Sequence, residues 1–149
     1  MHLTGNQIVN ADPSSLWKIL MDPVSLAKVV PNVSSLEKLS DDCFSAKLSL
    51  KIGPVNGNFS GNLYLDDINL EKSFALRTLQ QSKIGNANAD VQINLVPLDD
   101  NQTEVIFDGN IKLSGMLAGI GQRLVGGIAN KLTQQFFENL QNELTVTSN

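Results

Sequence analysis

The chain has 149 residues, of which 42% are hydrophobic and 17% charged, which is an ordinary globular composition. Its net charge of −4 argues against general nucleic-acid binding, which needs a basic face. The single cysteine, Cys43, excludes an internal disulfide and fits a reducing compartment. No secretory leader, linker or internal repeat is recognisable, so we expect one cytoplasmic domain over residues 1–149.

The first third of the chain predicts one strand followed by two short helices. Residues 2–10 alternate loosely between apolar and polar side chains, as in a strand. Asp12 and Asp22 are each followed by proline. An aspartate caps free backbone N–H groups and proline fits the first helical turn, so a helix is expected to begin at each. The second helix is expected to end at Pro31.

From residue 35 the hydrophobic period changes to two, which predicts β-strands. Six alternating runs follow as far as residue 113, with turn-rich breaks such as 53–57 and 99–101 between some of them. Consecutive antiparallel strands with one buried face are therefore expected. A long helix over about 115–144 completes the order β-α-α-β6-α, which is an α+β domain.

The expected last helix has an unusual composition. Its apolar row winds around the helix, because side chains four positions apart drift by about 40° at each step. A helix held by a strongly curved sheet would have such a row. Glycine costs about 1 kcal/mol relative to alanine inside a helix. Five glycines nevertheless fall in the first thirteen positions: Gly115, Gly119, Gly121, Gly126 and Gly127.

Small residues also occur at inward strand positions: Gly61, Ala87, Ala89 and Gly109. Together with the helix glycines they have two interpretations. Either the backbones approach closely and the core is solid, or a void remains that suits a hydrophobic ligand. The candidate lining residues are Leu48, Leu50, Phe59, Gly61, Leu63, Leu76, Ala89, Val91, Phe107, Gly109, Ile111, Leu117, Ile120, Gly121, Leu124 and Ile128. If the core is solid, Gly127→Leu should cost about 1–3 kcal/mol by overpacking.

Catalytic, metal and nucleotide sites have little support in the sequence. The one histidine, His2, is terminal, so a histidine-based triad or metal site would depend on it. The glycines do not complete a dinucleotide or phosphate loop, since Leu124 replaces the third glycine and Gly127 replaces the lysine. No catalytic residue, metal or cofactor is therefore predicted.

Four polar residues on predicted strands, Tyr64, Arg77, Asp90 and Asp108, are the candidates for any buried polar pair. The alternation of each strand places Arg77 opposite Leu76 and Asp108 opposite Phe107. Both side chains are therefore expected on the solvent side of the sheet.

Four groups of residues, spread over almost the whole chain, carry a family resemblance. They are Trp17 with Asp22-Pro23, Leu26 and Val30-Pro31; Ser35-Leu36-Glu37 with Asp41-Asp42-Cys43-Phe44; Ile52-Gly53-Pro54-Val55 with Gly57, Phe59 and Gly61; and Gly115, Leu117-Ala118, Gly121 and Arg123-Leu124 with Phe136-Phe137. This pattern resembles the CoxG family, named for a carbon monoxide dehydrogenase subunit, within the START-like, or SRPBCC, superfamily. Asn32 departs from it, because the family usually has glycine there.

The resemblance implies a helix-grip (START-like, Bet v 1-like) fold: a curved, seven-stranded antiparallel sheet wrapped on the long C-terminal helix. It also implies a non-catalytic accessory protein that carries a quinone or lipid, or helps recruit a molybdenum hydroxylase of the CO dehydrogenase type to the membrane. Some members continue into an apolar tail after the helix. This sequence stops soon after it, so at most peripheral contact with the inner face of the membrane is expected.

Two other functions stay open at this point. One is a helix-grip enzyme of the cyclase or dehydratase type, which needs a polar pair inside the cavity. The other is an interaction scaffold with a solid core.

Overall fold

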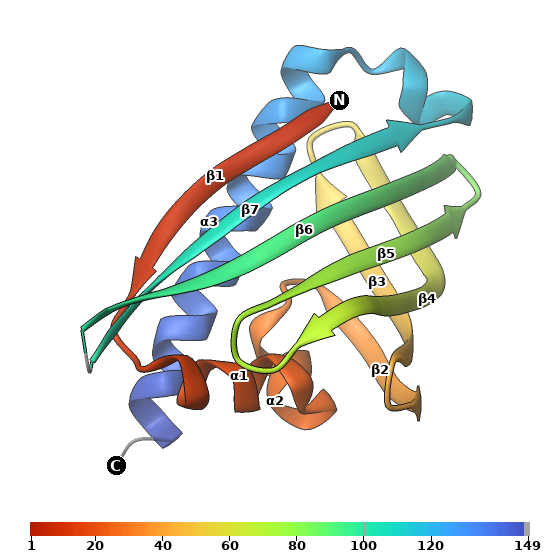
Figure 1. Ribbon diagram of the computed structural model, residues 1–149. Helices are drawn as coiled ribbons and strands as arrows, with labels where there is room; N and C mark the ends of the chain where they lie inside the picture. Colours follow the sequence, from red (N-terminus) through yellow and green to blue (C-terminus); the bar gives the residue numbers. More distant parts are fainter. Residues whose placement is uncertain (100, 148–149) are drawn as a thin grey trace.

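The chain forms the expected order of elements, with one short 3-10 helix added before the last helix. The computed structural model describes residues 1–99 and 101–147 (Figure 1). Its elements are β1 (His2–Val9), α1 (Pro13–Met21), α2 (Pro23–Val29), β2 (Val33–Ser40), β3 (Cys43–Ile52), β4 (Val55–Asn69), β5 (Ser73–Ser82), β6 (Gly85–Asp99), β7 (Gln102–Leu113), the 3-10 helix η1 (Gly115–Gly119) and α3 (Gln122–Thr147).

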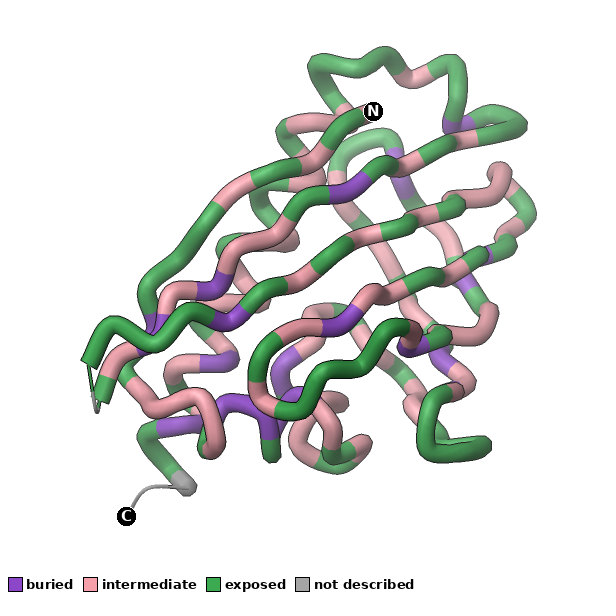
Figure 2. The backbone as a smooth tube through the Cα atoms, viewed as in Figure 1, coloured by how far each residue is buried: buried purple, intermediate pink, exposed green. Residues whose placement is uncertain are grey.

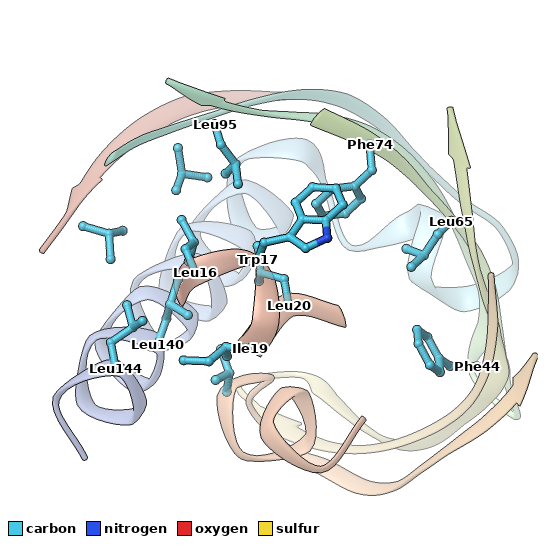
Figure 3. Close-up of a cluster of buried hydrophobic side chains, with 13 residues drawn as sticks. Leu16, Trp17, Ile19, Leu20, Phe44, Leu65, Phe74, Leu95, Leu140 and Leu144 are labelled. Atoms are coloured by element: carbon cyan, nitrogen blue, oxygen red, sulfur yellow. The ribbon is translucent and has the colours of Figure 1, made fainter. Parts of the chain in front are cut away.

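The seven strands form one antiparallel sheet in the order β1-β7-β6-β5-β4-β3-β2. After the two short helices the strands follow one another as a meander, and β1 adds to the edge beside β7. The sheet curves around α3 and the two short helices (Figures 1 and 3). The predicted helix-grip fold is confirmed, with the sheet open between its edge strands β1 and β2.

Both short helices begin where the sequence predicts. The carboxylate of Asp12 accepts hydrogen bonds from the Ser15 backbone N–H at 3.3 Å and hydroxyl at 2.6 Å. Asp22 accepts from the Ser25 backbone N–H at 3.1 Å and hydroxyl at 2.8 Å. The hydrogen bond from each serine hydroxyl lowers the pKa of the aspartate, because it stabilises the charged form.

The main hydrophobic core lies where α1, α2 and the C-terminal half of α3 pack against the sheet (Figure 3). Trp17 of α1 contacts Phe74 of β5 edge-to-face, with ring centroids 5.7 Å apart. Leu140 and Leu144 of α3 are 1% and 3% exposed. Figure 2 shows buried residues gathered at this end of the molecule, whereas the backbone from η1 into the start of α3 is mostly exposed. We call the first region the packed end and the second the glycine-rich end.

The prediction of one helix over 115–144 is wrong at its beginning. Gly115 and Gly121 have φ values of 66° and 100°, a left-handed conformation that glycine adopts without a steric penalty. These two residues bound η1 and separate it from α3, which begins at Gln122. Only Gly126 and Gly127 of the five glycines therefore lie inside α3.

Candidate functional site

A cavity of about 300 Å³ lies between α3 and the concave face of the sheet. Its walls come from β1, the end of α1, the segment after α2, β3, β6, β7 and the middle of α3. The lining residues are Leu3, Leu20, Val30, Pro31, Leu48, Leu50, Val91, Ile93, Val105, Phe107, Leu132, Thr133, Phe136, Phe137 and Leu140. We call this space the main cavity.

The wall of the main cavity is almost entirely apolar. Among the described residues, Thr133 is the one polar side chain that lines it. The Thr133 hydroxyl donates to the backbone oxygen of Ala129 at 2.8 Å, so its hydrogen is already used within α3. Phe107 stacks on Phe137 at 6.1 Å between ring centroids, and Phe136 meets Phe137 edge-on at 5.3 Å. These surfaces favour apolar and aromatic groups.

A smaller chamber of about 140 Å³ adjoins the main cavity on the side of the glycine-rich end. It is lined by Leu48, Leu50, Val55, Phe59, Gln80, Ala87, Leu113, Leu117, Ile120, Val125 and Ile128. Leu48 and Leu50 of β3 line both spaces, so these two side chains separate them. We call this space the inner chamber.

An outer groove lies on the other side of Ile120 and Ile128, which line both it and the inner chamber. Its remaining lining residues are Ile52, Gly121, Gln122, Arg123, Leu124, Gly127 and Lys131. The groove is therefore mixed in character, with two cations beside apolar side chains.

The predicted lining residues divide among these spaces. Leu48, Leu50, Val91 and Phe107 line the main cavity, and Phe59, Leu117, Ile120 and Ile128 line the inner chamber. Gly121 and Leu124 line the outer groove. Ile111 lines a further surface hollow that includes Lys112 and Val125.

Five predicted lining residues, all on strands, touch neither the main cavity nor the inner chamber: Gly61, Leu63, Leu76, Ala89 and Gly109. Leu63 and Leu76 pack against the main core instead. Gly61 and Gly109 permit close approach of backbones, because a Cβ atom at either would overlap the carbonyl oxygen of Leu79 or Asp90.

The glycines of the helical region behave in the opposite way. A Cβ atom at Gly119, Gly121, Gly126 or Gly127 would have no neighbouring atom within 4 Å outside its own local backbone. Gly127 is exposed and lines the outer groove. The expectation that Gly127→Leu would overpack a core is therefore wrong, since that side chain would enter open space.

Sequence reasoning missed most of the main cavity's helical wall. Leu132, Phe136 and Leu140 belong to the predicted apolar row, but a row of large side chains is expected to anchor the helix in a solid core. Gln80 was also missed, although it continues the inward alternation of Phe74 and Thr78 on β5. That alternation was the available signal.

The four polar strand candidates lie outside these spaces. Tyr64, Arg77, Asp90 and Asp108 are all exposed, as predicted for Arg77 and Asp108. Arg77 forms an ion pair with Asp66, whose carboxylate raises the pKa of the guanidinium. His2 contacts Asp108. Among residues 1–99 and 101–147 no group of three or more potential ligand side chains could hold a metal ion.

Comparison with known proteins agrees with this architecture. A conserved protein of Geobacillus kaustophilus has the same structure at a TM-score of 0.95 and 28% identity, over 99% of this chain and 97% of that one. The Zhui aromatase/cyclase from Streptomyces sp. R1128 shares the fold at a TM-score of 0.75 and 12% identity, over 100% and 96%. A START superfamily protein from Mycobacterium smegmatis does so at 0.74 and 13%, over 98% of each chain.

No curated protein matches the chain in sequence. Within the described part of the chain, no helix is long and apolar enough to cross a bilayer. The sequence profile of CoxG, a carbon monoxide dehydrogenase subunit, matches residues 5–145, from within β1 to near the end of α3. The chain therefore belongs to the CoxG family of carbon monoxide dehydrogenase subunits.

Proposed function

We propose that the protein is a non-catalytic carrier of a hydrophobic small molecule, a quinone or another lipid. The observation that carries this proposal is the apolar main cavity of about 300 Å³ between α3 and the sheet. Ligand pockets begin at about this size, and an apolar cavity of about 150 Å³ already holds benzene. The main cavity therefore has room for a ring with a short aliphatic chain.

The side chains around the two inner spaces support a binding role over catalysis. Thr133 and Gln80 are the polar side chains that line them within the described residues. Neither is a general acid or base, whereas cyclase or dehydratase chemistry needs groups that transfer protons. The acidic candidates Asp90 and Asp108 lie on the exposed face of the sheet.

We test the carrier function by ligand content and by probe binding. Native mass spectrometry and solvent extraction of the purified protein should reveal a bound lipid or quinone. The protein emptied by extraction should bind N-phenyl-1-naphthylamine, a neutral apolar fluorophore, at a single saturable site. Failure to find any extractable molecule, together with no saturable probe binding, would exclude the carrier function.

We further propose that the ligand is exchanged at the membrane through the glycine-rich end. Three long segments contain no aspartate or glutamate: 43–65, 72–89 and 109–137. In the fold these segments supply the β3–β4 turn, the β5–β6 turn and the passage from β7 through η1 into α3. All three lie at the same end of the sheet (Figure 1). This end therefore has no carboxylate on its loops, although the net charge of the chain is negative.

Cations and exposed apolar side chains share that end. Met116 of η1 is 74% exposed and Leu124 of α3 is 45% exposed. A basic side chain beside an anionic bilayer contributes about 1 kcal/mol to binding, and inserted apolar groups add to this. Five exposed cations, none with an ion-pair partner among the described residues, surround them: Lys51, Lys83, Lys112, Arg123 and Lys131.

Vesicle co-sedimentation tests this orientation. Binding should be stronger to phosphatidylcholine vesicles that contain 30% phosphatidylglycerol than to phosphatidylcholine alone, and it should weaken as salt is added. Lys112→Glu with Arg123→Glu should abolish the difference. Lys18→Glu with Lys72→Glu changes the net charge equally, but on α1 and the β4–β5 turn at the packed end, and should retain it. Equal loss in both double variants would contradict the orientation.

Family membership supports a molybdenum hydroxylase of the CO dehydrogenase type as the partner. Co-purification of tagged protein with that hydroxylase from membranes of the native host tests this partner. Recovery of the hydroxylase without the tagged protein, in every fraction, would exclude it.

A further inference from the structure

The inner chamber contains one buried polar side chain, Gln80 of β5. Its side chain is 5% exposed, and all other side chains that line the chamber within the described residues are apolar. The oxygen Oε1 of Gln80 is buried and accepts no hydrogen bond. A buried carbonyl oxygen without a donor is rare in folded proteins, because its interaction with water has been lost without replacement.

Neighbouring hydrogen bonds determine which way the Gln80 amide points. The Thr78 hydroxyl donates to the backbone oxygen of Asn62 at 2.9 Å. Since its hydrogen is used there, the Thr78 hydroxyl acts as acceptor for the Gln80 Nε2 group at 3.0 Å. Turning the amide over would set the Gln80 oxygen against an acceptor. The nitrogen therefore stays on Thr78, and the oxygen remains the free group of the chamber.

Water is a poor partner for this oxygen. A buried water is held by two to four polar groups, but the side chains of the inner chamber offer it one acceptor. A ligand that carries its own apolar body and one O–H group meets the same oxygen without that requirement. The chamber volume of about 140 Å³ is close to that of a cavity that holds one benzene ring.

We propose that the inner chamber binds the head of the carried ligand and that Gln80 Oε1 accepts a hydrogen bond from a neutral hydroxyl on it. This inference rests on the proposed carrier function and names its ligand class: an apolar molecule with a phenol, alcohol or quinol terminus. The tail lies in the main cavity beyond Leu48 and Leu50, which line both spaces. Ionised carboxylates and oxidised quinones present only acceptors, so their heads are disfavoured there.

The test compares two probes that differ in one hydrogen-bond donor. 4-Butylphenol donates through its hydroxyl, whereas 4-butylanisole has the same ring and tail but only an ether oxygen. Isothermal titration of the extracted protein should show about tenfold tighter binding of the phenol, which corresponds to about 1.4 kcal/mol. In Gln80→Leu the preference should fall to about twofold or less. Gln81→Leu, on the adjacent exposed position, should keep it.

A second variant separates recognition from folding. Gln80→Leu removes the unpaired oxygen, so its denaturation midpoint should not fall below that of the native protein. Thr78→Val retains Gln80 but removes the hydroxyl that orients its amide. The amide can then present its nitrogen to the chamber, so the anisole should gain affinity and the phenol preference should narrow.

The outcomes distinguish this inference from the carrier function. If the native protein binds both probes equally, or if Gln80→Leu retains the tenfold preference, head-group recognition is overturned and the carrier function stands. If the extracted protein binds neither probe and no apolar fluorophore, both are overturned. A phenol preference that Gln80→Leu and Thr78→Val both reduce supports the inference.

Discussion

The two ends of α3 differ in how they meet the rest of the protein. At the packed end Leu140 and Leu144 are almost fully buried against α1, α2 and the sheet. At the glycine-rich end Leu124 is 45% exposed, and Gly126 and Gly127 face open space. Both ends carry the same four-residue apolar spacing, so the difference lies in what each row contacts.

This contrast separates stability from binding along one helix. Burial of large side chains at the packed end supplies hydrophobic stabilisation. The cavities begin where that packing stops, and they continue toward the glycine-rich end. A helix fixed at one end and loosely covered at the other can hold an apolar ligand without relying on it to fold.

Truncation of a large side chain at each end gives the largest expected difference. Leu140→Ala should lower the free energy of unfolding by about 2–5 kcal/mol, because it leaves a void in the core. Leu124→Ala should change it by about 0.5 kcal/mol or less, as at other exposed positions. Urea denaturation measures both. Similar losses at the two sites would show that the glycine-rich end is packed as well.

Filling the main cavity should affect binding more than folding. Val91 of β6 lines the cavity, whereas Val96 of the same strand is 39% exposed. Val91→Phe should weaken binding of N-phenyl-1-naphthylamine about tenfold, since the ring occupies ligand space, and Val96→Phe should not. If Val91→Phe instead costs about 1–3 kcal/mol of stability with binding unchanged, the wall is solid there.

Alanine at a glycine should have opposite effects at the exposed helical position and at the close backbone contact. Gly127→Ala should raise the free energy of unfolding by about 0.5–1 kcal/mol, because the new methyl group meets nothing and helix propensity improves. Gly61→Ala should lower it, because its Cβ would overlap the Leu79 carbonyl oxygen. Thermal unfolding of the two variants tests the contrast, which a loss of stability in Gly127→Ala would break.

The smallest effect concerns the helix cap at the packed end. Hydrogen bonds from Ser25 lower the pKa of Asp22 in the folded protein. The stabilisation they provide is present above the unfolded pKa of about 3.9 and is lost as the pH falls through the lower folded value. The stability advantage over Asp22→Asn should therefore shrink between about pH 5 and pH 2. Ser25→Ala should reduce this pH dependence, and an unchanged advantage at pH 2 would contradict it.

Local chemistry in the sequence was enough for much of the fold. Both aspartate caps, the alternation of the strands and the outward position of Arg77 and Asp108 follow from backbone geometry alone, and all are observed. Alternation also assigned the apolar candidates to one face of the sheet. The family resemblance rested on residue types at fixed spacings, and it agrees with the fold and with the profile match.

Only the tertiary structure decided where space remains between those faces. A hydrophobic period states which side of an element is buried, but the volume left depends on sheet curvature and on the height of α3 above it. Gly61 and Gly127 thus had one interpretation in the sequence and have opposite surroundings in the fold. The unpaired oxygen of Gln80 likewise depends on Thr78 and Asn62, whose contacts exist only once β4 and β5 are paired.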